Sequence, residues 1–365
     1  MTPVTFVLPV LQPAGAERIV AELARRLPAH GFATSVICLE DDREAIGDEL
    51  RAANVPLTGL KISRRRTLAC AKALAAKLSA ERPQILHAHL FHANIAARAA
   101  YIRMGANGRR GLHVLSTVHV AERRFRPWQF ALDRITSRQT RAEICVSRAV
   151  KEFQQQRTRL PDSFFRVIEN GIDLSRFSPS PAEKAPGFSV LSVGRLDPQK
   201  DFSTLLLAWK NVESAMPQAQ LCIAGEGSER PALENLIRSL GLKNVRLPGF
   251  VQNVPELLRS VDVYVQPSAW EGFGLGVAEA MASALPVIVS DADSLPELVT
   301  HKKTGFVAPK GRPEEFARAI LELLNDRSRA AALGTAARAE ALTRFSVERM
   351  VSEYAGFYRE LLCAQ

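Results

Sequence analysis

Two basic residues lie five positions apart in a segment that follows a short apolar run of this 365-residue chain. Residues 189–193 have the pattern of a strand, and Gly194-Arg195-Leu196-Asp197-Pro198-Gln199-Lys200 follows directly. A guanidinium binds two oxygens at once and an ammonium adds a compact charge, so Arg195 and Lys200 together suit a diphosphate. A structural ion pair would explain the same residues, and for this segment alone that alternative stays open.

Two carboxylates flank a glycine-rich turn further along the chain. Residues 267–279 read Pro-Ser-Ala-Trp-Glu-Gly-Phe-Gly-Leu-Gly-Val-Ala-Glu, in which the turn opens a predicted helix. The free N–H groups at such a helix start can receive phosphate or sugar oxygens. Glu271 precedes the helix and Glu279 lies about two turns along it. We interpret them as acceptors for hydroxyls of a sugar and of a ribose; a capping carboxylate and an exposed helix residue are the structural alternative.

Parallel strands are needed to position these residues, because ligands of open α/β sheets bind beyond the carboxyl ends of the strands. Short apolar runs alternate with helical patterns along the whole chain, which is typical of parallel α/β folds. We expect strands near residues 4–10, 34–39, 85–89, 114–119, 144–146 and 167–169, and then near 189–193, 220–224, 245–247, 261–266, 287–289 and 305–307. Examples of expected helices are 16–27, 68–78, 95–102, 203–214, 228–240, 254–260, 275–283 and 313–324.

Turn-forming residues divide the two series of strands. Asn170-Gly171-Ile172-Asp173 and the Pro-rich stretch that follows it predict a boundary. We therefore predict two doubly wound domains, 1–173 and 188–345, joined by a linker at 174–187. The last segment, 346–365, has apolar residues at helical spacing and can pack on its own domain or cross back to the first.

The net charge of +10 is concentrated in the first half of the chain. Residues 1–173 hold 27 basic and 16 acidic side chains, whereas the remainder is nearly neutral. Arg123, Arg124 and Arg126 stand beside Trp128 in one of the basic runs. Such a field attracts nucleic acid, anionic lipid or phosphorylated substrates, although basic runs often only face water.

Cysteine usage and hydropathy indicate the compartment. The five cysteines are scattered and form no CxxC pair, which favours a reduced cytoplasm over a disulfide scaffold. Neither a secretion signal nor an apolar run of membrane-spanning length is apparent. We therefore expect a cytoplasmic protein whose membrane contact, if any, is peripheral at the inner face of the plasma membrane.

Several motifs, taken in order, resemble the retaining glycosyltransferases of family 4, which have the GT-B architecture of two facing Rossmann-like domains. The segment from Glu271 to Glu279 resembles the paired-glutamate motif of that family. The other matches are Ala14-Gly15-Ala16-Glu17-Arg18, Asn170-Gly171-Ile172-Asp173, Gly194-Arg195-Leu196 with Lys200, Gly225-Glu226-Gly227 and Leu247-Pro248-Gly249-Phe250-Val251. The resemblance covers nearly the whole chain and is most specific over 189–300.

The resemblance implies roles for the matching residues. Arg195 and Lys200 would hold the donor diphosphate and stabilise the leaving charge, while Glu279 would accept from the ribose and Glu271 from the donor sugar. Further donor contacts, mainly through the main chain, are implied for Gly15, Ala16, Gly194, Gly225, Val251, Asn253, Phe273, Gly274 and Leu275. Ala14 departs from the family pattern, which often has a glycine there, so only Gly15 keeps full backbone freedom in that loop.

Histidines at two predicted strand ends could bind a metal, but packing or contact with acceptor and donor explains them better. His87 and His89 alternate on one predicted strand, and His119 closes the next. We favour His119 for a role in the reaction, with a buried structural imidazole as the alternative, and place His89 on the acceptor side. Asp291-Ala-Asp293 resembles a metal-binding DxD, but it leads into a capped helix start that matches the family pattern. We therefore expect a metal-independent enzyme without a cofactor.

The predicted function is transfer of a sugar from a UDP- or GDP-sugar to a glycan or polyprenyl-diphosphate-linked acceptor, with retention of configuration. Assembly of bacterial surface polysaccharides, such as lipopolysaccharide, O-antigen, capsule or exopolysaccharide, is the expected setting. Arg123, Arg124, Arg126 and Trp128 would then dock on anionic lipid or capture the acceptor. A sugar-nucleotide epimerase on a similar scaffold is the first alternative and a nucleic-acid-binding protein the second, although RNA-binding and helix-turn-helix motifs are lacking. A nicotinamide-dependent dehydrogenase is weakest, because no strand precedes a G-x-G-x-x-G fingerprint.

Overall fold

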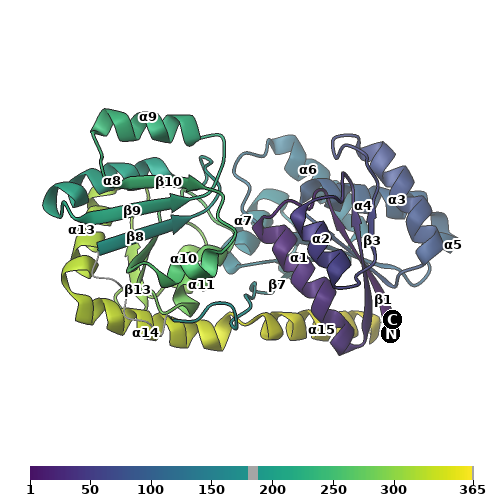
Figure 1. Ribbon diagram of the computed structural model, residues 1–365. Helices are drawn as coiled ribbons and strands as arrows, with labels where there is room; N and C mark the ends of the chain where they lie inside the picture. The colour runs from purple at the N-terminus through teal and green to yellow at the C-terminus, as the bar shows by residue number, and fades with distance from the viewer. Residues whose placement is uncertain (180–187, 364–365) are drawn as a thin grey trace. The chain divides into compact units, whose positions relative to one another are not determined.

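The computed structural model describes residues 1–179 and 188–363, which form two compact units (Figure 1). The first unit comprises Met1–Gly171 and the chain from Val347 onward, and the second comprises Ile172–Ser346. The division falls two residues before the predicted boundary at 173. Part of the predicted linker, 180–187, lies outside the described residues.

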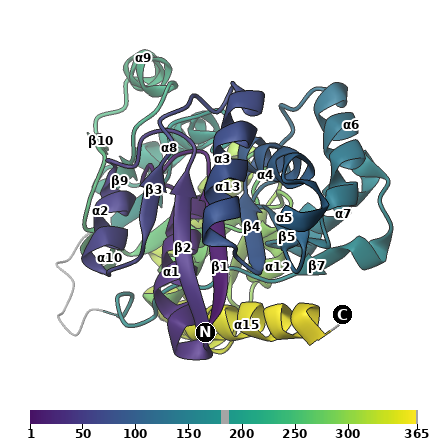
Figure 2. The ribbon, with the colours of Figure 1, turned by 90° about the vertical axis from the view of Figure 1, so that its right-hand side faces the viewer.

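The described residues of the first unit contain a sheet of seven parallel strands (Figure 2). Their order is β3-β2-β1-β4-β5-β6-β7, so that the chain builds one half of the sheet and then crosses over to build the other. The strands are β1 (Thr2–Leu8), β2 (Phe32–Cys38), β3 (Leu57–Gly59), β4 (Ile85–His89), β5 (His113–Val118), β6 (Ala142–Cys145) and β7 (Phe165–Val167). The sequence analysis missed β3, which has only three half-buried residues and therefore little apolar signal.

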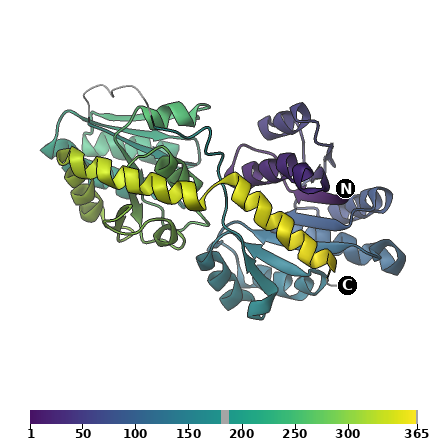
Figure 3. The same cartoon turned by 90° about the horizontal axis from the view of Figure 1, so that it is seen from below.

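Helices connect these strands, and the last helix of the chain also belongs to this unit. They are α1 (Gly15–Arg26), α2 (Ala45–Ala52), α3 (Thr67–Glu81), α4 (Phe91–Arg103), α5 (Gly105–Arg109), α6 (Pro127–Thr136), α7 (Arg148–Thr158) and α15 (Val347–Cys363). Helix α15 lies along the first unit, as Figure 3 shows, and Arg26 of α1 pairs with Glu348 at 2.8 Å. The last helix, with its apolar stripe, thus belongs to the first unit.

One buried arginine ties three elements of the first unit together. Arg98 of α4 is fully buried and forms ion pairs with Asp133 of α6 and, at 3.2 Å, with Glu143 of β6. The hydroxyls of Ser116 and Thr140 accept further hydrogen bonds from the guanidinium. Because a buried cation is costly without partners, this network fixes where α6 lies against the sheet.

The described residues of the second unit contain a six-stranded parallel sheet of order β10-β9-β8-β11-β12-β13. The strands are β8 (Phe188–Val193), β9 (Ala219–Ala224), β10 (Val245–Gly249), β11 (Val263–Gln266), β12 (Val287–Ser290) and β13 (Gly305–Ala308). The helices are α8 (Phe202–Ala215), α9 (Arg230–Leu240), α10 (Val254–Arg259), α11 (Leu275–Ala282), α12 (Leu295–Leu298), α13 (Pro313–Asn325) and α14 (Arg327–Arg344). Together the two units confirm the predicted doubly wound α/β class.

Helix α14 was absent from the sequence predictions. Its fully buried positions are mainly small residues, including Gly334, Ala337 and Ala341, so it lacks the stripe of large apolar side chains that identifies a helix. A Cβ at Gly334 would lie 2.2 Å from the carbonyl oxygen of Ala284, which shows how closely the helix packs. No helix in the described part of the chain is long and apolar enough to cross a bilayer.

Backbone hydrogen bonds donated by two glycines connect the carboxyl ends of three neighbouring strands. Gly225, after β9, donates to the carbonyl of Gly249 at 2.8 Å, and Gly194, after β8, donates to that of Ala224 at 3.0 Å. Gly225 has a φ of +148°, and a Cβ there would lie 1.9 Å from the carbonyl oxygen of Gly194. This position therefore requires glycine on both conformational and steric grounds.

We predict that Gly225→Ala destabilises the second unit by more than about 3 kcal/mol, because strain at positive φ adds to a backbone clash. The measurement is urea unfolding. Gly241→Ala is the matched control: its φ is +68° but no described atom lies within 4 Å of the added Cβ. It should cost only about 1 kcal/mol, and equal losses in the two variants would refute the close-packing argument.

Candidate active site

Lys200 and Glu271 form an ion pair at the carboxyl edge of the second sheet. The lysine lies in the loop between β8 and α8, and the glutamate follows β11. Their side chains are only 17% and 6% exposed. The stem of Lys200 runs beside Gly194, where a Cβ would lie 3.1 Å from the lysine Cε. The loop geometry therefore holds a cation and a carboxylate together at the edge where α/β sheets bind ligands.

A chain of hydrogen bonds from β11 orients Glu271. Tyr264 donates to Gln266 Oε1, Gln266 Nε2 donates to Ser268, and Ser268 donates to Glu271 Oε1, each at 2.8 Å. The backbone N–H of Glu271 donates to Asp293 at 3.2 Å. Since all these residues except Asp293 belong to one strand and its exit, the strand itself sets the direction of the carboxylate.

The two oxygens of Glu271 differ in their surroundings. Oε1 accepts from both Lys200 and Ser268, whereas Oε2 accepts no hydrogen bond within the described residues. A buried carboxylate oxygen retains capacity for further donors. Glu271 can therefore accept a ligand hydroxyl at Oε2 while Oε1 stays fixed by the protein.

The glycine-rich turn after Glu271 opens α11 as predicted from the sequence. Gly274 caps the helix with a φ of +101°, a conformation that side chains rarely adopt. Leu275 is the first helical residue, so the N–H groups of the first turn point out of the helix toward any bound anion. Phe273 has its ring buried 5.6 Å from that of Phe345, which leaves only its main chain for a ligand.

Glu279 lies on α11 and is half-buried. Tyr264 lies near both glutamates: burial first, and then the charges of Glu279 and Glu271, raise the pKa of its phenol. Tyr264 therefore remains a neutral hydroxyl that donates within the chain from β11. Gly276 makes room for this hydroxyl, because a Cβ there would lie 2.5 Å from the tyrosine oxygen.

Arg195 is more exposed than Lys200 and has a different partner. Its guanidinium is 62% exposed and lies 3.1 Å from Asp197. The two cations of the predicted diphosphate site thus share one loop, but each contacts its own carboxylate. The interpretation of this segment as a structural ion pair and its interpretation as a diphosphate site are compatible in this geometry.

The remaining sequence candidates of the second unit lie near the same edge with mixed roles. Gly194 and Gly225 form the close backbone contact described above. Val251 is half-buried in the loop between β10 and α10. Asn253 caps α10 by accepting from the N–H of Glu256 and donating to its carboxylate, so its side chain has a structural function. The structure therefore leaves mainly the backbone of this loop for contact with a base.

The candidates of the first unit fall in three places. Gly15 and Ala16 are the first residues of α1, and the helix begins at Gly15 despite the preceding Ala14. His89 ends β4, and its Nδ1 lies 2.9 Å from Nε2 of His119 beyond β5. The basic run precedes α6. Glu122 accepts two hydrogen bonds from Arg124, at 2.7 and 3.0 Å, and Arg123 lies over the ring of Phe153.

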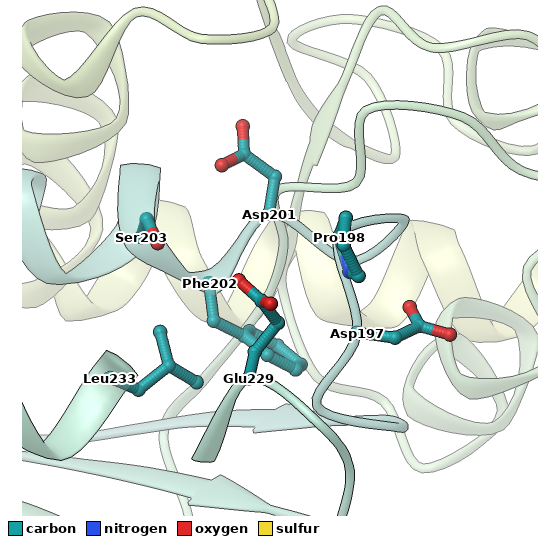
Figure 4. Close-up of a pocket in the computed structure, with 7 residues that line it drawn as sticks. All are labelled: Asp197, Pro198, Asp201, Phe202, Ser203, Glu229 and Leu233. Atoms are coloured by element: carbon teal, nitrogen blue, oxygen red, sulfur yellow. The ribbon is translucent and has the colours of Figure 1, made fainter. Parts of the chain in front are cut away.

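The acidic residues do not converge on a cation site. Asp291 accepts from the backbone of Lys310 and Asp293 from that of Glu271, so both carboxylates are used within loops. A neighbouring hollow of about 160 Å³ is lined by Asp197, Asp201 and Glu229, whose carboxylates point in different directions (Figure 4). No group of three potential ligands that could hold a metal occurs in the described parts of the chain.

The sequence analysis missed Tyr264, Gln266 and Ser268. A usable signal was present: these polar residues alternate with Val263, Val265 and Pro267, so they share one face of an otherwise apolar strand. A buried strand that carries polar side chains on one face needs partners for them. Here the partner is Glu271.

Two family models match the chain. The model described as "Glycosyl transferases group 1" matches residues 175–340, and the model described as "Glycosyltransferase Family 4" matches residues 13–176. A galactosyltransferase of Escherichia coli, which uses UDP-Gal and acts on α-D-GlcNAc-diphosphoundecaprenol, is 27% identical over 86% of each chain. A lipopolysaccharide core mannosyltransferase of Rhizobium meliloti is 29% identical over 54% of this chain and 61% of its own length.

Solved structures share the fold over the whole chain. Anabaena HepE, in complex with UDP and glucose, has a TM-score of 0.87 with 23% identity, and the match covers 99% of this chain and 100% of that one. The sucrose-phosphate synthase of Thermosynechococcus elongatus has a TM-score of 0.84 with 21% identity, and the match covers 100% of both chains.

The Lys200–Glu271 pair should show strong energetic coupling. Lys200→Met leaves a buried carboxylate without its cation and should cost about 3 kcal/mol. Lys200→Met combined with Glu271→Gln should recover most of that loss, because no buried charge then remains. A double-mutant cycle by urea unfolding measures this coupling.

Arg318→Met is the matched control, because Arg318 and its partner Glu315 are 71% and 39% exposed. Loss of this surface pair should change stability by less than about 0.5 kcal/mol. A Lys200→Met variant as stable as Arg318→Met would contradict the assignment of a buried pair.

Proposed function

The chain belongs to the glycosyltransferases of family 4, and we propose that it transfers a sugar from a UDP- or GDP-sugar with retention of configuration. The second unit binds the donor and the first unit serves the acceptor. The reaction needs no metal ion. The acceptor is a glycan or a lipid-diphosphate-linked glycan of bacterial surface polysaccharide assembly.

The observation that carries this proposal is the state of Glu271. Its Oε1 is fixed by Lys200 and Ser268, and its Oε2 is available within the described residues for a donor-sugar hydroxyl. A carboxylate that is already oriented loses little freedom on binding, so it can hold the sugar in one reactive position. Glu279, close to the same tyrosine, supplies a second acceptor for ribose hydroxyls.

The site must also stabilise the negative charge that develops on the leaving diphosphate. Arg195 and Lys200 lie on one loop, and the first turn of α11 adds N–H donors. Positive groups that are held in place where negative charge develops lower the barrier directly. These groups would perform the task that a divalent cation has in metal-dependent sugar transfer.

The relatives support both donor bases. The E. coli relative uses UDP-Gal, while a GDP-mannose-dependent mannosyltransferase of Mycobacterium tuberculosis is 30% identical over 54% of this chain and 57% of its own length. Contacts to the base through the backbone near Val251 do not select one base by side-chain chemistry. UDP-sugars and GDP-sugars therefore both need to be tested as donors.

An exposed face of α6 supports peripheral membrane binding by the first unit. Trp128 and Ile135 are 57% and 67% exposed and lie seven residues apart, so they share one face of the helix. Arg126, Arg134 and Arg138 flank them, and these guanidinium groups have no carboxylate partner among the described residues. An amphipathic surface of this composition suits a bilayer with anionic lipid.

A second basic run, with Arg64 and Arg65, lies near the segment that precedes α6. Phe125, before α6, contacts Phe91 at a ring distance of 4.9 Å, and His92 beside it lies near Arg64 and Arg65. Two runs that are sixty residues apart in sequence therefore flank the start of α4. Their combined charge suits the diphosphate of a lipid-linked acceptor as well as lipid headgroups.

Glu271→Gln should abolish transfer while nucleotide binding and folding persist. The variant removes the charge that orients the donor sugar but keeps the shape of the side chain. A thermal-shift panel of UDP, GDP and other nucleotide diphosphates identifies the base, because a ligand of the native state raises apparent stability. Transfer from the corresponding sugar nucleotides to a lipid-diphosphate glycan is then followed by NMR of the anomeric product.

The matched control for this assay is Glu256→Gln, which changes the exposed carboxylate that accepts from Asn253 Nδ2 at the start of α10. It should retain turnover within about threefold, as expected for an exposed substitution that costs little stability. Normal turnover in Glu271→Gln, or an inverted product, would contradict the proposed mechanism.

The triple substitution of Arg126, Arg134 and Arg138 by glutamine should weaken binding to vesicles that contain phosphatidylglycerol. Each basic residue near such a surface contributes about 1 kcal/mol, so partitioning should fall roughly a hundredfold. Vesicle co-sedimentation measures this, with neutral phosphatidylcholine vesicles as reference.

The control for charge alone is the substitution of Lys302, Lys303 and Lys310 by glutamine, since these exposed lysines belong to the second unit. It should leave binding nearly unchanged. An equal loss in both triple variants would show that net charge, and not the α6 face, causes the attraction.

A further inference from the structure

Three histidines form a cluster in the first unit, in which His87 and His89 are fully buried and His119 is half-buried. His87 and His89 alternate on β4, where both point to one face of the sheet, and His119 follows the neighbouring strand β5. Burial lowers the pKa of His87 and of His119 to about 3, and holds that of His89 well below its usual range. All three rings are therefore neutral near pH 7, and each carries one N–H.

His87 has its hydrogen bonds satisfied inside the unit. Its Nδ1 lies 2.6 Å from the hydroxyl of Tyr358 on α15, and its Nε2 lies 2.7 Å from the hydroxyl of Thr117. A hydroxyl can donate or accept, so both ring nitrogens are served in either tautomer. His87 is thus a structural residue.

His89 has an asymmetric environment that selects its tautomer. Its Nδ1 lies 2.9 Å from Nε2 of His119, whereas its Nε2 is fully buried with no hydrogen-bond partner in the described part of the chain. With the hydrogen on Nε2, His89 would bury an unpaired N–H; with the hydrogen on Nδ1, it leaves only an unpaired acceptor. Unpaired buried donors are the rarer of the two. The hydrogen therefore belongs on Nδ1, which donates to Nε2 of His119.

We propose that His89 is a positioning residue that fixes His119 as the Nδ1–H tautomer, so that His119 presents a hydrogen-bond donor to an oxygen of the bound sugar. The proposal rests on the proposed function and on the prediction from the sequence that His119 has a role in the reaction. Because its Nε2 accepts from His89, His119 has no lone pair left for a general base. Its Nδ1 makes no hydrogen bond within the described residues, and the side chain is only partly buried.

The tautomers are measured directly by long-range ¹H–¹⁵N correlation on the whole chain labelled with ¹⁵N-histidine. Individual histidine substitutions assign the seven rings. We expect His89 and His119 each to show a protonated Nδ1 and an unprotonated Nε2. A protonated Nε2 on His119 would overturn the proposal, whatever the activity of the protein.

Two variants of His89 test whether the tautomer of His119 affects the rate of the reaction. His89→Leu keeps an apolar side chain in the buried site but removes the donor, so His119 should lose its single tautomer and kcat should fall about tenfold or more with little change in KM. His89→Asn offers an amide N–H near the former Nδ1 and should recover most of both losses. Unchanged kcat in His89→Leu would refute the positioning role.

Tyr358→Phe is the matched control. It removes a buried hydrogen bond from the same cluster, to His87, but leaves the bond between His89 and His119 intact. The His119 tautomer and kcat should stay as in the wild type. A loss equal to that of His89→Leu would mean that packing of the cluster alone matters. Absence of any sugar transfer by the wild type would instead refute the proposed function, while the tautomer measurement would stand.

Discussion

The carboxyl edge of the second sheet is organised around a single buried carboxylate, Glu271. Lys200 and Ser268 both donate to Oε1 of Glu271, and these contacts offset the cost of burying a carboxylate. That requirement extends into the sheet: β11 carries polar side chains on one face, and Gly276 leaves space for the tyrosine that starts the chain. The glycine contacts of Gly194 and Gly225 bring the lysine loop to the same place. Packing and site chemistry are thus one set of constraints in this unit.

In the histidine cluster of the first unit, burial keeps the side chains uncharged, whereas in the second unit a buried charge is paired. His87, His89 and His119 have no carboxylate partner among the described residues, so removal from water keeps these three rings neutral and their hydrogen-bond direction becomes the property that matters. Helix α15 contributes the hydroxyl that satisfies His87, so the end of the chain completes this cluster. On another side of the unit, the Arg98 network fixes α6 and leaves its amphipathic face exposed. One unit thus combines an uncharged interior site with a basic surface.

Some predictions from the sequence concerned where a residue lies in the fold, and others concerned what its side chain does. The strand ends that precede Arg195, Lys200 and Glu271, and the helix that carries Glu279, were located correctly, because a strand, a glycine turn and a helix start are local patterns. The individual tasks of side chains were harder to predict. Asn253 caps a helix, and the charge of Arg124 is paired with Glu122, although both residues matched motifs or runs with a functional interpretation. Short-range hydrogen bonds of this kind depend on loop conformation, which composition does not fix.

By itself the sequence determined the α/β class, the division into two units and the family, because strand and helix periodicity and ordered motifs are properties of contiguous residues. Only the tertiary structure decided which partners the chemistry-bearing residues have. It paired Lys200 with Glu271, seventy-one positions away, and joined His89 to His119 across neighbouring strands. It also placed two distant arginine runs around the start of α4. The physical reason is that the protonation state of a buried group, and the atom it presents to a ligand, follow from neighbours that only folding brings within hydrogen-bonding distance.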